Sequence, residues 1–160
     1  MCRYRCVAVG GTFDVLHIGH QALLSKSFEL GHEVVIGITS DEFALRLGKV
    51  LDHGYDERFS MIREFLKEVF PDSKYSIWKL DNYFGPAILL DRVEAIVVST
   101  ETYHRVKIAN EERKKRGLDS LKVEVVSLVN ADNGMPISTR RIRRGEIDSE
   151  GHQIKYGNLD

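Results

Sequence analysis

The chain of 160 residues has little cysteine and almost no net charge. Its two cysteines, Cys2 and Cys6, are too few for a disulfide framework and lack the spacing of a metal site, which indicates buried or free thiols. With 23 basic and 24 acidic residues the net charge is −1, so charge gives no attraction to nucleic acid or to a membrane surface. No apolar run approaches the roughly 20 residues of a membrane span, and the N-terminus has no signal-peptide pattern. We therefore expect a cytoplasmic protein with neither nucleic acid nor a membrane as partner.

Two widespread phosphate-binding motifs are also missing. The chain contains no Gly-x4-Gly-Lys-Ser/Thr, which argues against a P-loop, and no Gly-x-Gly-x-x-Gly, which argues against a dinucleotide-binding turn. It shows no internal repeat and no low-complexity segment. A hydrophobic content of 42% is enough for one ordinary core in a chain of this length. We expect residues 1–160 to form a single domain, with the polar stretch 146–160 as a loosely held tail.

Strand-like and helix-like stretches alternate along the chain. Short apolar runs predict buried strands, and apolar residues three and four positions apart predict the helices between them. The expected strands are 6–9, 32–38, 75–80, 95–98 and 123–129, and the expected helices are 22–30, 41–47, 55–70, 87–90, 103–116 and a basic helix start at 136–144. We expect Trp78, on the third strand, in the core. The alternation indicates an α/β protein with a Rossmann-like, doubly wound, five-stranded parallel sheet and helices on both faces.

The stretch 10–20 joins the first strand to the first helix. Gly10 and Gly11 let the backbone approach a ligand closely, and Thr12 adds a hydroxyl. The helix that follows is expected to present free N–H groups and a partial positive charge, which suit a phosphate. His17 and His20 are three residues apart in its first turn, so both rings can face one ligand. These features together indicate a polyphosphate site.

Other polar residues come directly after the remaining predicted strands. In a doubly wound sheet, ligands bind beyond the carboxyl ends of the strands, where the strand order reverses. We therefore expect one crevice to be lined by Gly11, Thr12, Thr39, Ser40, Asp81, Ser99, Glu101, Ser138 and Thr139.

The pattern G-G-T-F-D-x-x-H-x-G-H at 10–20 resembles the signature of the nucleotidyltransferase superfamily. With the stretches 37–41, 80–86, 97–102, 110–113, 116–118 and 136–143, the chain resembles the archaeal type of phosphopantetheine adenylyltransferase over about residues 7–151. This resemblance implies transfer of AMP from ATP to 4′-phosphopantetheine, giving 3′-dephospho-coenzyme A and pyrophosphate, in coenzyme A biosynthesis. ATP would carry Mg²⁺ as the cofactor. The family's late I-S-S-T-R-I signature differs here, because the stretch 137–142 shifts the hydroxyls and adds a base.

The resemblance also implies roles for single residues. It implies that His20, His17, Lys49 and Thr12 are catalytic and that no residue of the chain is a dedicated metal ligand. For ATP binding it implies Gly10, Gly11, Thr12, Phe13, His17, His20, Ser99, Glu101, Ile137, Ser138, Thr139 and Arg140. For binding of the acceptor it implies Thr12, Thr39, Ser40, Lys49 and Asp81.

Several alternatives stay open at this point. A cytidylyltransferase, or an adenylyltransferase for nicotinamide or flavin mononucleotide, would have the same fold, and a non-enzymatic nucleotide sensor is a further class. Asp14 is either a buried residue that orients the turn or a ligand of Mg²⁺. Lys49 lies between Gly48 and Gly54, so we expect a mobile loop that brings it in only with substrates. His53 has no helical partner at metal-binding spacing and is expected at the surface or in packing. No oligomeric state is indicated by the residues.

Overall fold

The computed structural model describes residues 2–127. The predictions for the tail at 146–160, for the basic helix start, and for Ile137, Ser138, Thr139 and Arg140 lie outside the described residues. Within them the elements follow in the order β1 (Tyr4–Gly11), α1 (Ile18–Leu30), β2 (Gly31–Thr39), α2 (Asp41–Arg46), α3 (Tyr55–Val69), β3 (Lys74–Leu80), α4 (Gly85–Leu89), β4 (Ala95–Ser99), the 3₁₀ turn η1 (Tyr103–Arg105), α5 (Val106–Lys115) and β5 (Lys122–Val126). The predicted alternation of strands and helices is confirmed.

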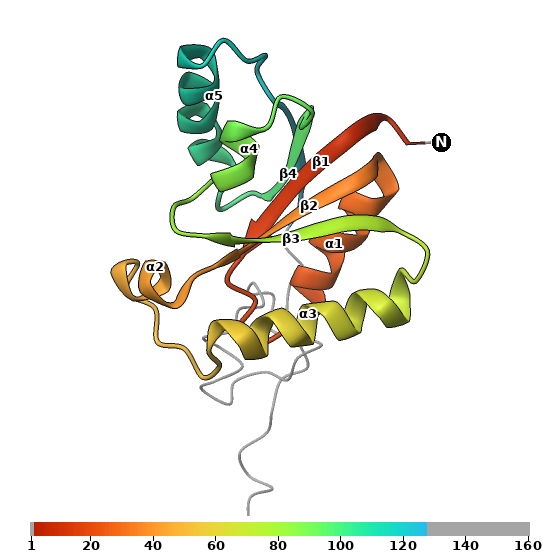
Figure 1. Ribbon diagram of the computed structural model, residues 1–160, viewed down its shortest axis with the longest axis vertical. Helices are drawn as coiled ribbons and strands as arrows, with labels where there is room; N and C mark the ends of the chain where they lie inside the picture. The colour runs from red at the N-terminus through yellow and green to blue at the C-terminus, as the bar shows by residue number, and fades with distance from the viewer. Residues whose placement is uncertain (1, 128–160) are drawn as a thin grey trace, which may run out of the picture.

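The five strands form one parallel sheet in the order β3-β2-β1-β4-β5. The chain therefore starts in the middle, builds outward through β2 and β3, and returns to the other side of β1 for β4 and β5 (Figure 1). β1 pairs with β2 from Tyr4 to Gly11, but with β4 only through Val7 and Ala8. The order reverses between β1 and β4, and ligands of doubly wound sheets bind beyond the strand ends at such a point.

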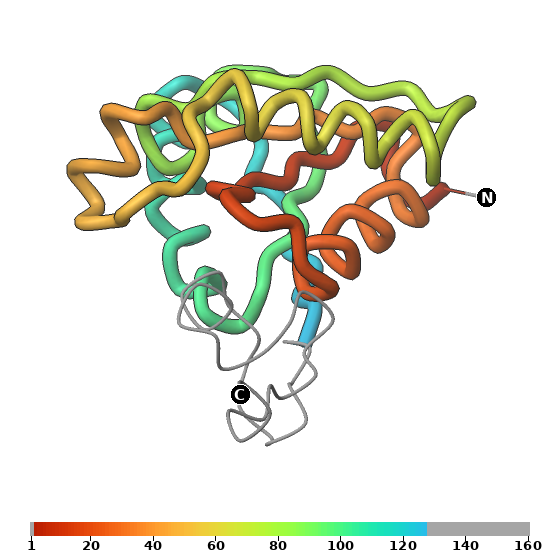
Figure 2. The backbone as a smooth tube through the Cα atoms, turned by 90° about the horizontal axis from the view of Figure 1, so that it is seen from below, coloured from red at the N-terminus to blue at the C-terminus, as the bar shows by residue number. Residues whose placement is uncertain are grey.

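Helices cover both faces of the sheet, and each face has its own core. Figures 1 and 2 show α1 and α3 on one face and α4 and α5 on the other. The core between α1, α3 and the sheet consists of Val9, Leu24, Val34, Ile36, Ile38, Ile62 and Leu66. The core between α4, α5 and the sheet includes Ala8, Val35, Ala87, Ile96, Val98, Val106 and Ala109. Apolar burial of this extent, at about 25 cal/mol per Å², is the main stabilising contribution and holds the strand ends in place.

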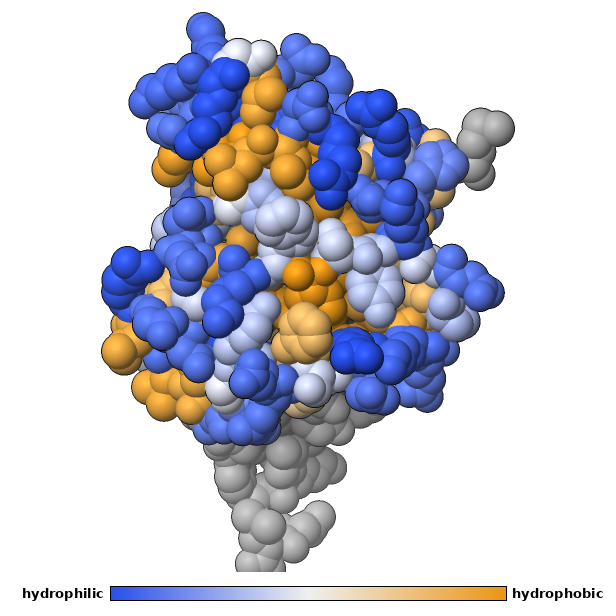
Figure 3. All heavy atoms as spheres, in the orientation of Figure 1, coloured by the Kyte–Doolittle hydropathy of each residue, from blue (hydrophilic) through white to orange (hydrophobic). Residues whose placement is uncertain are grey.

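Trp78 is one position where the sequence interpretation was wrong. It was expected in the core but is 38% exposed, and its ring nitrogen donates to Ser76 Oγ at 2.9 Å. The reason is topological, because β3 is an edge strand and Leu80 is its only buried residue. In the view of Figure 3 one apolar patch lies in the region of α4 and α5, and further apolar side chains are visible at the centre and at the lower left.

Candidate active site

The turn after β1 is made by Phe13 rather than by the glycines. Gly10 and Gly11 still belong to β1, whereas Phe13 has a φ of 54°, a left-handed conformation that costs a residue other than glycine of the order of 1 kcal/mol. The Phe13 side chain is buried in the core, below Gly11 and edge-to-face with His20 at 4.9 Å between ring centroids. The ring supports His20, and the predicted contribution of Phe13 to ATP binding stays a prediction.

His17 and His20 cap the start of α1 reciprocally. His17 is the N-cap, and its Nδ1 accepts hydrogen bonds from the backbone N–H groups of Gly19 at 3.1 Å and His20 at 3.4 Å. In return, His20 Nδ1 accepts from the His17 N–H at 3.4 Å. The prediction of free N–H groups here was wrong for Gly19 and His20, because the His17 ring occupies both. With each Nδ1 accepting, the neutral rings carry their proton on Nε2.

Both histidines are held in the neutral form. Burial lowers the pKa of His17 to about 4. Burial, the neighbouring His17 and the charge of Lys49 lower the pKa of His20 to about 3, while a hydrogen bond from the ring to the Val15 backbone acts in the opposite direction. The two rings stack with centroids 3.7 Å apart and planes inclined by 18°, a geometry in which two positive charges would repel. At neutral pH the pair offers N–H donors rather than fixed charges.

Lys49 reaches the turn from the loop before α3. Its Nζ donates to Thr12 Oγ1 at 2.8 Å, so the structure brings together two residues that are 37 positions apart. Burial, together with the charges of Arg105 and Arg58, lowers the pKa of the Lys49 ammonium, and Glu101 acts in the opposite direction. The loop was expected to carry Lys49 in only with substrates. The structure already places Nζ at Thr12, so no loop movement is needed to form this contact.

Asp14 anchors that loop. It is 2% exposed, and its carboxylate accepts the backbone N–H groups of Asp52 and His53, each at 3.0 Å. His53 Nδ1 lies 2.9 Å from the Asp14 carbonyl oxygen. The structural interpretation of Asp14 is confirmed, while a contact with Mg²⁺ stays a prediction. His53 is half-buried in this contact, as the packing interpretation expected.

Arg58 connects the loops around the site and was not among the predicted site residues. Its side chain is fully buried on α3 and donates to the carbonyl oxygens of Thr12 at 2.8 Å, Thr39 at 2.7 Å and His53 at 3.1 Å. Its fourth partner is the carboxylate of Asp41, at 2.8 Å. An arginine inside the otherwise apolar stripe of α3 is the only sequence signal that could have identified it.

The remaining predicted residues lie at the carboxyl edge of the sheet, but their side chains differ in availability. Thr39 Oγ1 donates to the Gly11 carbonyl at 3.2 Å, and Ser40 Oγ caps α2 by accepting the Phe43 N–H at 3.1 Å. Both are buried, so these hydroxyls serve the fold, and their predicted contact with the acceptor stays a prediction. Asp81 and Glu101 are exposed at the edge.

Ser99 is half-buried at the end of β4, with Oγ 3.4 Å from Thr102 Oγ1. Ser99 ends β4 and Thr12 follows β1, so the two residues stand at the ends of the strands between which the order reverses. Its predicted contact with ATP, like that of Glu101, stays a prediction.

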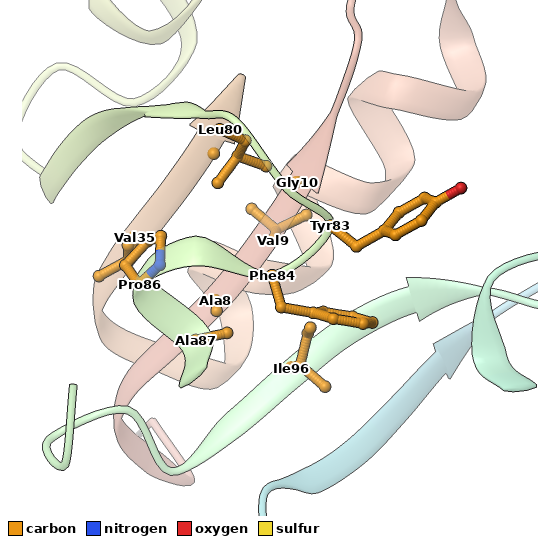
Figure 4. Close-up of a pocket in the computed structure, with 11 residues that line it drawn as sticks. Ala8, Val9, Gly10, Val35, Leu80, Tyr83, Phe84, Pro86, Ala87 and Ile96 are labelled. Atoms are coloured by element: carbon orange, nitrogen blue, oxygen red, sulfur yellow. The ribbon is translucent and has the colours of Figure 1, made fainter. Parts of the chain in front are cut away.

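An apolar pocket opens beside Gly10, between the sheet and α4 (Figure 4). The Tyr83 hydroxyl points away from the other labelled residues, which places this ring at the edge of the pocket, and the Phe84 ring lies near Ile96. The lining residues are Ala8, Val9, Gly10, Val35, Gly37, Leu80, Tyr83, Phe84, Pro86, Ala87 and Ile96. The pocket therefore adjoins the carboxyl end of β1, next to the turn that carries Thr12.

The described residues 2–127 contain neither a metal-binding cluster nor a membrane-spanning helix. No three histidine, cysteine or acidic side chains in this range come close enough to hold a metal ion together. None of the helices in the same range is both long and apolar enough to cross a membrane.

Comparison with known proteins agrees with this geometry. The family model described as cytidylyltransferase-like matches residues 8–145. The phosphopantetheine adenylyltransferase of Methanothermobacter thermautotrophicus is 44% identical over 153 residues, which cover 96% of this chain and 92% of the relative. The protein of the same name from Pyrococcus horikoshii is 42% identical over 97% of this chain and 98% of its own.

Among solved structures, a protein of unknown function from Archaeoglobus fulgidus is similar with a TM-score of 0.66 and 32% identity, over 75% of this chain and 87% of the other. The family model covers more than half of the chain, and the relatives match along almost their whole length. The chain therefore belongs to the cytidylyltransferase-like family and, by its similarity to these archaeal relatives, to the phosphopantetheine adenylyltransferases.

Proposed function

We propose that this protein transfers AMP from ATP to 4′-phosphopantetheine, giving 3′-dephospho-coenzyme A and pyrophosphate in coenzyme A biosynthesis. The observation that carries the proposal is the meeting of Thr12 and Lys49 beside the stacked pair of His17 and His20, at the reversal of strand order. A hydroxyl, an ammonium and two neutral N–H donors are what a phosphoryl transfer needs for binding and charge stabilisation. The family of the chain and the names of its relatives support the same reaction.

The chemistry requires no activated side chain, because the acceptor phosphate is itself a nucleophile. One of its oxygens attacks the α-phosphorus of ATP, and the bond from that phosphorus to the bridging oxygen of the β-phosphate breaks. Pyrophosphate leaves with the bonding electron pair. The enzyme's task is to align the two phosphates, which supplies about 7–11 kcal/mol at best, and to stabilise the charge that moves to the leaving group.

Thr12 and Lys49 are assigned to the acceptor phosphate and the α-phosphate. The ammonium lies between groups whose mutual repulsion is greatest in the transition state, where a positive charge is worth most. His20, with His17 behind it, is assigned to the phosphate chain of ATP through Nε2–H. Such neutral donors fit the low pKa values of the two rings.

The other predicted contacts complete the substrate sites. ATP would reach Ser99 and Glu101 on the β4 side, and its predicted contacts at 137–140 lie outside the described residues. The acceptor would lie near Thr39, Ser40 and Asp81 at the same edge. Mg²⁺ would come with ATP, since this ion keeps several waters and binds phosphates readily, and no cage of carboxylates is formed by residues 2–127. A reaction that uses ATP and a soluble phosphorylated acceptor fits the expected cytoplasmic location.

The direct test is pyrophosphate release from ATP or CTP with a panel of phosphate acceptors. We expect ATP with 4′-phosphopantetheine to give by far the fastest release. Faster release from CTP with choline phosphate or glycerol phosphate would assign the protein to the cytidylyltransferases instead. No release with any pair, together with binding of ATP, would indicate a nucleotide sensor.

A further inference from the structure

The backbone that carries Lys49 is bonded to the last turn of α2. The C-cap residue of this helix is followed by Gly48, which has a φ of 76°. The Gly48 N–H donates to the Leu45 carbonyl oxygen at 2.9 Å. The Lys49 N–H donates to the Ala44 carbonyl oxygen at 3.0 Å. Two such bonds around a left-handed residue form a Schellman motif, so residues 44–49, here called the α2 cap, fix the Lys49 backbone.

The α2 cap depends on the left-handed conformation of Gly48. A positive φ costs a residue with a β-carbon more than it costs glycine, asparagine tolerates it better than most residues, and a β-branched residue tolerates it least. Among residues 2–127, a β-carbon at position 48 would meet no atom within 4 Å beyond its chain neighbours. A substitution here therefore acts on the cap through the backbone conformation and not through a steric clash.

The segment that begins with Lys49 is held at its far end by His53. The His53 N–H donates to the Asp14 carboxylate at 3.0 Å, and its carbonyl oxygen accepts from Arg58 Nε at 3.1 Å. Asp14 belongs to the same turn as Thr12, and Arg58 donates to the Thr12 carbonyl oxygen at 2.8 Å. The segment is thus bonded to α2 at one end and to the Thr12 turn at the other.

From this geometry we infer that Gly48 is a positioning residue for the reaction, because it closes the cap that places Lys49 beside Thr12. The inference rests on the proposed function, in which the Lys49 ammonium meets the two phosphates. A lysine on an unfixed loop would lose backbone and side-chain freedom on binding them, and this loss would weaken the contact. Here the backbone is ordered beforehand, and Nζ lies 2.8 Å from Thr12 Oγ1. The glycine that suggested a mobile loop fixes this segment instead.

The end of α5 provides a second cap with the same geometry. Gly117 follows its C-cap residue with a φ of 75°, and a β-carbon there would also meet no described atom within 4 Å. The Gly117 N–H donates to the Lys114 carbonyl oxygen at 3.1 Å, and the Leu118 N–H donates to the Arg113 carbonyl oxygen at 2.9 Å. This α5 cap, residues 113–118, leads toward β5 at the amino end of the sheet, so it is a matched control.

The test replaces each of the two glycines by asparagine, alanine and valine, in the order in which a left-handed backbone becomes more costly. Gly48→Val should lower kcat/KM for the acceptor about 5- to 10-fold in pyrophosphate release, approaching the loss expected when the Lys49 charge is removed. Gly48→Ala should lose less, and Gly48→Asn should stay close to the wild type. The Gly117 variants should lower the urea midpoint in the same order with unchanged kcat/KM.

A Lys49→Met background shows whether Gly48 acts through Lys49. Adding Gly48→Val there should cause no further loss of kcat/KM, because the group that the α2 cap places is already missing. A further loss as large as in the wild-type background would overturn the inference. Equal losses of kcat/KM in Gly48→Val and Gly117→Val would also overturn it. Urea unfolding establishes that each variant is folded under the assay conditions.

Acylation of lysine amines, followed by mass spectrometry, tests the position of Lys49 without turnover. The hydrogen bond to Thr12 slows acylation of Nζ, so Gly48→Val should raise the rate at Lys49 about 3- to 10-fold relative to exposed Lys67, while Gly117→Val should not. An unchanged rate would overturn the inference even if pyrophosphate is released. A raised rate in a protein that releases no pyrophosphate would support the positioning of Lys49 by Gly48 and refute the proposed reaction.

Discussion

The two ends of the sheet each contain one fully buried arginine, and the two are used differently. At the carboxyl end, Arg58 binds the carbonyl oxygens of Thr12, Thr39 and His53 and the carboxylate of Asp41. At the amino end, Arg113 binds only carbonyl oxygens, those of Ala87, Leu90, Val93 and Asp119. Both arginines donate to backbone carbonyl oxygens in loops and at the ends of helices and strands, where the regular hydrogen bonds of a helix or sheet supply no donor.

The difference lies in what each arginine holds. Arg113 joins the end of α4 to the approaches of β4 and β5, where no predicted catalytic side chain lies. Arg58 joins the turn after β1, the end of β2 and the loop of Lys49, which together carry the site. The same interaction thus serves the scaffold at one end and the position of reactive groups at the other.

The largest expected effect comes from exchanging each arginine for lysine. An ammonium cannot reach four acceptors at once, so Arg58→Lys and Arg113→Lys should each lower the free energy of unfolding by about 3 kcal/mol. Only Arg58→Lys should also lower kcat/KM, by about 10²-fold, because displacement of the Thr12 turn by about 1 Å misaligns the phosphates. Urea unfolding and steady-state kinetics below both unfolding midpoints measure the two effects. An equal loss of activity in folded Arg113→Lys would contradict the conclusion that only Arg58, at the carboxyl end of the sheet, positions the reactive groups.

The next effect concerns the chemistry of the carboxyl end alone. His20→Ala should lower kcat about 10²-fold or more, as loss of one charge-stabilising donor does, while the protein stays folded. His32→Ala removes an exposed histidine at the amino end of β2 and should leave turnover unchanged. The measurement is kcat for pyrophosphate release. Normal turnover in folded His20→Ala would show that this ring does not contribute to the reaction.

Acid should destabilise the carboxyl end through the same histidines. Burial lowers the pKa of His17 to about 4, so below the ordinary value of about 6.5 the unfolded chain binds a proton that the folded chain does not. Stability conferred by the neutral ring is therefore present above that value and is lost as the pH falls, by about 2 kcal/mol between pH 7 and 5 for this one histidine. Urea unfolding at the two pH values measures it. A His17→Asn variant with an unchanged pH dependence would contradict the assignment.

A smaller effect is expected at Lys49. Lys49→Met should lower kcat/KM for the acceptor about tenfold, the value of one charge-assisted contact, while the equilibrium dissociation constant of ATP changes little. Lys67→Met removes the same charge from the outer surface of α3 and serves as the control. Unchanged acceptor kinetics in Lys49→Met would show that the contact of Lys49 with Thr12 stabilises the structure and does not act on the acceptor.

The fold could be predicted from the sequence because its signals are local. Apolar runs and helical spacing located all five strands, and the resemblance at 10–20 placed His17 and His20 at the first helix. The contacts that assemble the site are not local. Arg58 lies 46 positions from Thr12, and Lys49 lies 37 positions from it, so no spacing along the chain reveals either pair. The left-handed conformation of Phe13 was not predicted for a different reason. The adjacent Gly10 and Gly11 can adopt a positive φ at a lower energetic cost, so the turn was expected at these glycines.

The smallest effect separates the structural and chemical roles of His17. Its Nδ1 accepts the N–H groups of Gly19 and His20, and loss of an N-cap acceptor costs about 1 kcal/mol. His17→Ala should show this loss in urea unfolding at pH 7. His17→Asn should recover most of it, because the amide oxygen of asparagine stands close to the position of Nδ1. Neither variant has a donor at the position of Nε2, so both should lose turnover to the same extent. Recovery of turnover together with stability in His17→Asn would mean that His17 acts on the reaction only by capping α1 and orienting His20.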